Sequence, residues 1–183
     1  THLNIGIFSM DSKSIMEIHH IFSNLKYITV TSSISRLDLS ETRLEGIKLC
    51  SNEIEIVGLP KSLVSLDLQI WNYYDDIFED YYFRGDYLSA GKLVITHELP
   101  KLRKLEITYF DTIVLPELPQ LKELCLQYTK MSSLPICNPK IIFLDHAINI
   151  DMIPSMTNLK DLTVRKTKIV ELPEFPIARN FWW

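Results

Sequence analysis

The sequence predicts a β-rich solenoid of the α/β type, in which short strands stack into a parallel sheet on the concave side and the convex side is mostly non-helical. Three observations predict this fold class. The motif L-x-x-L-x-L recurs at steps of 18 to 20 residues. Its last two leucines alternate with polar residues, which is typical of a strand with one buried face. Several units end in a Leu-Pro pair, and proline favours an extended return segment over a helix.

The repeated motif covers most of the chain. A unit of about 19 residues cannot bury its own apolar side, so stacked neighbours must bury it together. We therefore predict a single domain over 1–183, with repeats over 25–71 and 96–175. One gap of 39 residues interrupts the regular steps and equals about two units. Copies of the motif begin at Leu25, Leu44, Leu63, Leu102, Leu121, Ile141 and Leu159, and the copy at Ile141 is the weakest.

The first 24 residues are predicted to cap the solenoid. The segment LNIGIF suits a short strand, and the segment 11–24 has the apolar spacing of a helix, with Ile15, Ile18 and Ile21 in its register. A solenoid needs a cap because its terminal unit would otherwise expose one side of the core. We expect residues 1–24 to contain a strand followed by a capping helix.

The first repeats allow two interpretations of which side faces inward. Apolar residues recur there every 9 or 10 residues, so both halves of a turn can be strands. We assign the motifs from Leu25, Leu44 and Leu63 to the concave sheet, because they keep step with Leu102 and Leu121. The opposite choice would move every face assignment before residue 70.

Residues 72–95 do not fit the repeat and are interpreted as an irregular, inserted unit. Within them, 72–87 holds five of the eight tyrosines and five acidic residues against one arginine. Insertions in repeat proteins often emerge on the binding face, and tyrosine brings a large contact area at low entropic cost. We predict a partner-binding loop; the alternatives are a solvated loop whose tyrosines pack on the solenoid, and a distorted repeat. The candidate contact residues are Tyr73, Tyr74, Asp75, Asp76, Tyr81 and Tyr82.

The apolar end of the chain, 176–183, is predicted to cap the last turn or to mark a truncation point. Its final residues, Phe181, Trp182 and Trp183, would form an unusual exposed apolar patch on a monomer.

These motifs resemble the leucine-rich repeat proteins, whose pattern is L-x-x-L-x-L-x-x-N/C-x-L. The short units with Leu-Pro pairs are most similar to the repeats of bacterial type III effectors, including ubiquitin-ligase effectors of the IpaH type, and to the FNIP repeats of amoebae and their giant viruses. The resemblance implies a right-handed superhelix and a cytoplasmic protein, in the host cytosol for an effector or a viral protein. The usual asparagine of the repeat is mostly replaced by threonine, serine or aromatic residues.

Composition and motifs argue against catalysis and against several classes of ligand. The net charge is −4, and the five glycines form no phosphate-binding motif. His19 and His20 are adjacent and would point apart on a helix, so they form no metal pair. Cys50, Cys125 and Cys137 lack CxxC spacing and indicate reduced thiols. We expect no enzyme activity, no cofactor or metal, and no binding of nucleic acid, membrane or a small-molecule substrate.

The concave face is the candidate binding surface. The repeat register places residues two, four, six and seven positions after each first leucine on this face, and Tyr109 and Tyr128 should stack one rung apart. An acidic stripe edged by tyrosines suits a basic protein or peptide partner; the alternative is an ordinary solvated face. The stripe consists of Asp67, Glu106, Glu123, Asp145 and Asp161. The candidate contact residues are Asp67, Gln69, Glu106, Tyr109, Glu123, Gln127, Tyr128 and Asp145.

Three functions agree with these patterns. The first is a non-catalytic module that binds a protein or peptide through the concave face and the 72–87 loop. The second is an adaptor in ubiquitin ligation that docks through residues 11–24, where MEIHHIFSNL resembles the first helix of an F-box. The third is a structural fragment of a longer repeat protein, whose apolar end stacks on the next repeat.

Overall fold

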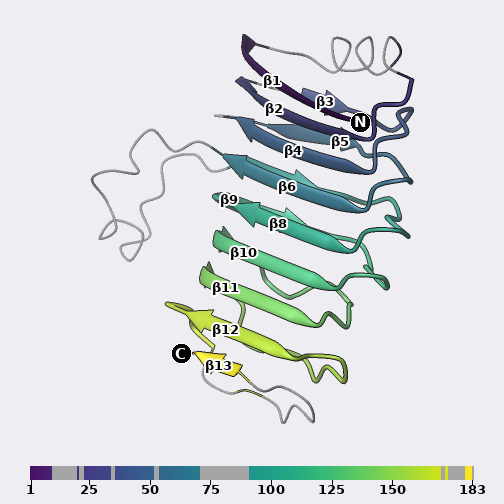
Figure 1. Cartoon of the computed structure of the whole chain (residues 1–183). Coiled ribbons are helices and arrows are strands. Elements are labelled where there is room, and N and C mark those ends of the chain that lie inside the picture. Colours follow the sequence, from purple (N-terminus) through teal and green to yellow (C-terminus); the bar gives the residue numbers. More distant parts are fainter. Residues whose placement is uncertain are drawn as a thin grey trace.

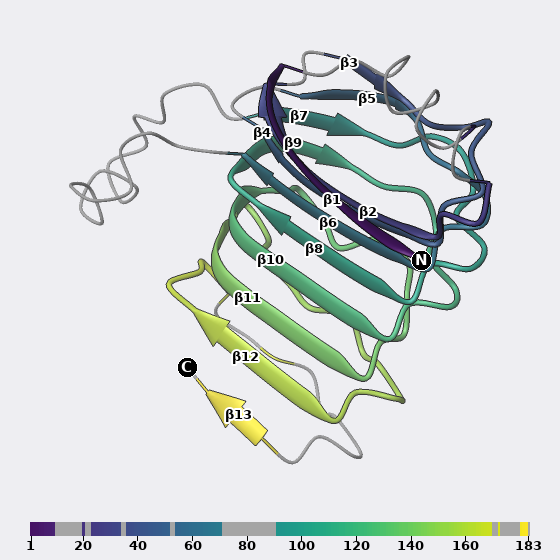
Figure 2. The same cartoon turned by 45° about the horizontal axis from the view of Figure 1, so that its top comes forward.

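Two parallel sheets make up the described part of the chain in the computed structural model (Figures 1 and 2). The structure describes residues 1–9, 20, 23–33, 36–51, 54–70, 91–169, 172 and 180–182. The large sheet consists of β1 (His2–Ser9), β2 (Tyr27–Ser33), β4 (Gly46–Ser51), β6 (Ser65–Ile70), β8 (Lys104–Thr108), β10 (Glu123–Lys130), β11 (Ile141–Ile148), β12 (Asp161–Arg165) and β13 (Asn180–Trp182), in that spatial order. The small sheet consists of β3 (Arg36–Asp38), β5 (Glu55–Gly58), β7 (Gly91–Val94) and β9 (Phe110–Val114).

The chain winds as a parallel β-solenoid. From β2 to β9 it alternates between the large and the small sheet, so each turn adds one strand to each stack. Every strand pair is parallel, and Figure 2 shows both stacks running along the same solenoid. The turns after β9 return without a further strand of the small sheet, because 131–140 and 149–160 contain only turns, bends, irregular backbone and one isolated bridge. The predicted β-rich repeat solenoid is confirmed.

The core lies on the inward side of the large sheet because its strands alternate buried apolar residues with exposed ones. In β10, Leu124 and Leu126 are buried, whereas Glu123 is exposed and Cys125 and Gln127 are partly exposed. Leu126 has Ile107 and Leu144 as its register partners on the two neighbouring strands. Equivalent residues of successive turns therefore stack in columns, which gives the solenoid a continuous apolar interior.

The register of the first repeats is settled by the pairing of the strands. β6 pairs with β8 through Ser65 and Lys104, so the motifs from Leu25, Leu44 and Leu63 belong to the same sheet as the later ones. The predicted assignment is confirmed. In this part both halves of each turn are strands, because β3 and β5 form the small sheet.

One predicted register is wrong. Ile141 pairs with Glu123 rather than standing level with Leu121, so the repeat there begins two residues earlier, at buried Pro139. A hydrogen bond from the Lys140 amide to the Lys122 carbonyl, 2.8 Å long, continues this register. A shift of two residues leaves each side chain on the same sheet face, because the strand period is two.

The 39-residue step between Leu63 and Leu102 is one turn of the solenoid, not two. β6 pairs directly with β8. Gly91–Val94, inside the range predicted to be irregular, is the regular strand β7. A Cβ atom on Gly91 would overlap the Ile70 side chain, so Ile70 and Gly91 are neighbours in the solenoid. The 39-residue step is 20 residues longer than an ordinary step of 19, and the segment 71–90 has this length. The six loop residues predicted to contact a partner lie outside the described residues.

Excision of 71–90 is expected to leave the solenoid folded. Joining Ile70 to Gly91 through a Gly-Ser linker spans neighbouring points, and loop-closure entropy changes only slowly with loop length. We expect a melting temperature within about 5 °C of wild type, measured by circular dichroism. The matched control removes 91–103 instead, including buried Leu93, and should unfold. Loss of a cooperative transition in the excision variant would contradict the prediction.

Both ends of the described chain join the large sheet. β1 pairs in parallel with β2, which confirms the predicted strand LNIGIF and makes it part of the same sheet. At the other end, β13 pairs in parallel with β12. The capping helix predicted over 11–24 falls almost entirely outside the described residues. Within the described chain, no helix has the length and apolar character needed to span a membrane.

Candidate protein-interaction surface

The outer face, defined as the side of the large sheet turned away from the core, presents three columns of side chains. Strand register aligns them across β2 to β12, and all but Gly46 are at least partly exposed. The first column is Tyr27, Gly46, Ser65, Lys104, Glu123, Ile141 and Asp161. The second is Thr29, Lys48, Asp67, Glu106, Cys125, Phe143 and Thr163. The third is Thr31, Cys50, Gln69, Thr108, Gln127, Asp145 and Arg165.

The predicted acidic stripe is interrupted by cations. Asp67 and Glu106 are register partners in the second column, as the repeat predicts. However, Lys48 Nζ lies 2.6 Å from Asp67 Oδ2, and Lys104 Nζ lies 3.5 Å from Glu106 Oε2. The hydrogen bond to Asp67 raises the pKa of Lys48 above its ordinary value. Glu123 and Asp161 lie in the first column and Asp145 in the third, so the five acids form no single row.

The surroundings of Asp145 differ from those the sequence predicts. The corrected register places it level with Gln127 and beside Arg165, its partner on β12. Its Oδ1 lies 2.8 Å from His146 Nδ1, which holds the carboxylate at the edge of the face. The Arg165 guanidinium lies 5.9 Å from the centre of the Phe143 ring, within the range of a cation–π contact. This corner of the face is therefore mixed in charge.

A column of stacked rings borders the outer face near the C-terminal ends of β8, β10 and β11. Tyr109 and Tyr128 stack with ring centres 4.8 Å apart, which confirms the prediction, and His146 continues the stack 4.4 Å from Tyr128. All three have positive φ, at 66°, 49° and 51°, a conformation uncommon for residues other than glycine. Lys166 continues the column with φ 47°. Tyr109 lies between β8 and β9, Tyr128 and His146 lie inside β10 and β11, and Lys166 directly follows β12.

His146 was missed because of the displaced register. Tyr109 and Tyr128 are each the seventh residue after the first position of their repeat, and counting from Pro139 instead of Ile141 gives His146 the same place. The signal was present in the sequence, but the incorrect start assigned that place to Ile148.

Two of the three thiols, those of Cys125 and Cys137, are weak nucleophiles. Burial raises the pKa of Cys125, and it raises the pKa of Cys137 to about 11, so both are protonated at neutral pH. The Gln127 side-chain amide donates to Cys125 Sγ at 3.4 Å, and the Cys50 thiol donates to the Gln69 carbonyl at 3.3 Å. The described residues contain no group of three or more His, Cys, Asp or Glu that could hold a metal ion.

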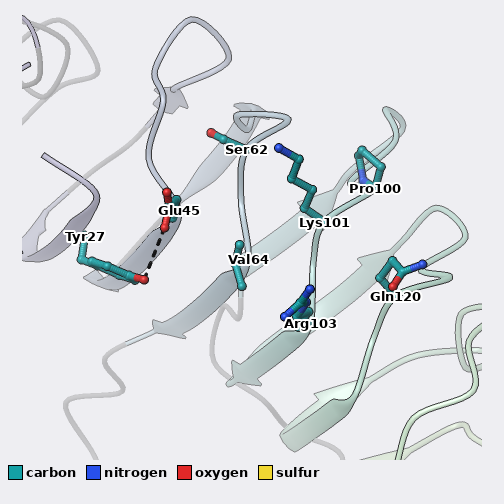
Figure 3. A pocket seen from close by; sticks show the side chains of 8 residues that line it. All are labelled: Tyr27, Glu45, Ser62, Val64, Pro100, Lys101, Arg103 and Gln120. Carbon is teal, nitrogen blue, oxygen red and sulfur yellow. Dashed lines mark hydrogen bonds between the residues drawn. The ribbon is translucent and has the colours of Figure 1, made fainter. Parts of the chain in front are cut away.

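A groove of about 510 Å³ lies along the edge where the strands of the large sheet begin (Figure 3). Tyr27 covers Gly46, because a Cβ there would overlap its ring, and the Tyr27 hydroxyl donates to Glu45 at 3.5 Å. Lys26 Nζ also contacts Glu45, at 2.8 Å, and this hydrogen bond lowers the pKa of the Glu45 carboxyl. The lining residues are Tyr27, Glu45, Ser62, Val64, Pro100, Lys101, Arg103 and Gln120.

Comparison of the chain with protein-family models, curated proteins and solved structures finds no match. The chemistry of the surfaces described above therefore carries the functional argument.

Proposed function

We propose that the protein is a non-catalytic recognition module that binds a protein or peptide of basic character through the outer face and the segment 72–87. The supporting observation is the outer face itself, a regular parallel sheet surface whose polar side chains stand in register over successive turns. Its three columns contain five acidic residues and three basic ones. Glu123 is exposed and makes no ion pair with another described residue, so its carboxylate is available to a partner.

The proposal includes the architecture and setting that the repeat pattern suggests. The turns are leucine-rich repeats in a right-handed superhelix whose concave side is the outer face, with a capping helix over 11–24 and a location in the cytoplasm. Short units of 18 to 20 residues with buried leucines at fixed places support it. A rigid sheet suits recognition because a partner can dock without ordering the site, which lowers the entropic cost of binding.

The test uses a pair of charge reversals on the outer face. Affinity capture and mass spectrometry first identify a bound protein, and its affinity is then measured with purified components. The double variant Glu106→Arg/Glu123→Arg should weaken binding by about tenfold or more, because each arginine repels a basic partner. Both residues are at least partly exposed, so the melting temperature should stay close to that of wild type.

The control is Glu55→Arg, a single charge reversal at an exposed strand glutamate on the small sheet. It should leave the affinity unchanged, because β5 belongs to the other sheet of the solenoid. Equal affinities for wild type and the outer-face double variant would contradict the proposal. A loss of binding free energy in Glu55→Arg about half as large as in the double variant would show that only overall charge matters, because Glu55→Arg makes half the charge change.

A further inference from the structure

Four cationic residues stand in one column along the edge where the strands of the large sheet begin. Arg103, Lys122, Lys140 and Lys160 each immediately precede a strand, and all four side chains are exposed. Their backbones are joined rung by rung, since the amides of Lys122, Lys140 and Lys160 each donate to the carbonyl of the previous cation at 2.8 Å. We call these four residues the basic column. At about 4.8 Å per rung, it is about 14 Å long.

The charges of the basic column are not compensated within the described structure. None of the four cations forms an ion pair with a described residue, whereas Lys26, three rungs before Arg103 in the same column, is paired with Glu45 at 2.8 Å. Like charges on neighbouring strands destabilise a sheet, so folding alone does not favour four cations in register. The arrangement is therefore better explained by an external anion.

We propose that the basic column binds an extended acidic segment of a partner polypeptide, which lies along this edge and crosses the starts of β8, β10, β11 and β12. Lysine and arginine form their strongest hydrogen bonds with carboxylates, and successive rungs offer one cation each. Exposed Lys101 and Gln120 add donors at the upper end. There the groove of Figure 3 opens between Tyr27 and Arg103 and can take an apolar or aromatic side chain of the same segment against Tyr27, Val64 and Pro100.

A polypeptide fits this edge better than a nucleic acid or a membrane. Single-stranded nucleic acids need aromatic rings on which bases stack, and the residues on either side of each cation include none. Glu123 and Asp161 directly follow Lys122 and Lys160, so a wide anionic surface such as a duplex or a bilayer would also meet these carboxylates. A single extended chain is narrow enough to stay on the column. This site is opposite in charge preference to the outer face and does not depend on it.

The probe for the test is a fluorescein-labelled peptide of alternating glutamate and serine, about twelve residues long, which when extended exceeds the length of the column. Fluorescence anisotropy at about 50 mM salt should show binding that weakens strongly at about 200 mM, as expected for exposed charges. The double variant Lys122→Glu/Lys140→Glu should bind at least about tenfold more weakly. The control Lys92→Glu/Lys168→Glu makes the same charge change away from the column, at two exposed lysines, and should bind like wild type.

Circular dichroism melting checks that both double variants fold. If Lys122→Glu/Lys140→Glu does not fold, the single variant Lys140→Gln replaces it in the binding assay. Absence of peptide binding, or an equal loss in both double variants, would overturn the proposal. Parallel titrations with a uridine oligonucleotide and with phosphatidylserine vesicles test the other polyanions. Tighter binding of either one, lost in Lys122→Glu/Lys140→Glu, would assign the column to that class instead. The outcome is separable from the proposed function, because that function is tested with a basic partner and with outer-face variants.

Discussion

Leu126→Ala is expected to lower the free energy of unfolding by about 2 to 5 kcal/mol, the range for a buried leucine whose removal leaves a cavity. Leu126 is 0% exposed and lies in the middle of the large sheet, between Ile107 on β8 and Leu144 on β11. The ladder hydrogen bonds that keep these strands in register prevent them from closing into the cavity. Urea unfolding followed by circular dichroism measures the loss.

Two controls separate the position of Leu126 from the substitution itself. Gln127→Ala, on the opposite face of the same strand, should change stability by about 0.5 kcal/mol or less. Leu162→Ala makes the same substitution at a buried residue of β12, near the end of the described sheet, where the repeat has fewer stacked neighbours, and should cost less than Leu126→Ala. If Leu126→Ala and Gln127→Ala unfold at the same urea concentration, the inward packing of β10 is wrong.

The fold could be predicted where leucine marks the inward side and could not be where other residues take its place. The copies at Leu102 and Leu121 have their leucines at the buried positions, so pattern matching finds the strands. At the next turn, buried Pro139 replaces the first leucine, and the apolar but 40% exposed Ile141 imitates it. Apolar character alone cannot distinguish an inward from an outward residue on a strand. The pairing of β1 with β2 and that of β13 with β12 depend on the free edge of the neighbouring strand, and no local sequence pattern indicates such an edge.

The candidate site could be predicted in its columns but not in its electrostatics. The stack of Tyr109 on Tyr128 follows from the repeat, because one rung brings equal positions within contact distance. The cations Lys48 and Lys104, which neutralise part of the acidic stripe, become visible only when each residue has a definite neighbour. The repeat pattern does not reveal the basic column, because its residues occupy the position directly after the first residue of each repeat, where the motif specifies no residue type.

Tyr128→Ala is expected to lower the free energy of unfolding by about 1 to 3 kcal/mol, although the ring is only partly buried. Tyr128 is the middle of the stack, so its removal breaks ring contacts with both Tyr109 and His146, each worth about 0.5 to 1.5 kcal/mol for an aromatic pair. Alanine also retains the conformational cost of φ 49° but lacks the ring contacts that offset this cost in the wild type. Urea unfolding measures the change.

A substitution series at Tyr128 separates the ring from the backbone. Tyr128→Phe keeps the ring and should be the most stable of the three variants. Tyr128→Gly should be more stable than Tyr128→Ala, because glycine adopts positive φ without a steric cost. Equal stability of the alanine variant and wild type would show that the stack does not support the fold. The order of stability also decides how binding data are interpreted, because a variant that loosens β10 affects every neighbouring contact. Loss of binding in Tyr128→Ala would then not identify Tyr128 as a contact residue, whereas loss in Gln127→Ala would identify Gln127, since its side chain lies on the outer face and is not part of the ring stack.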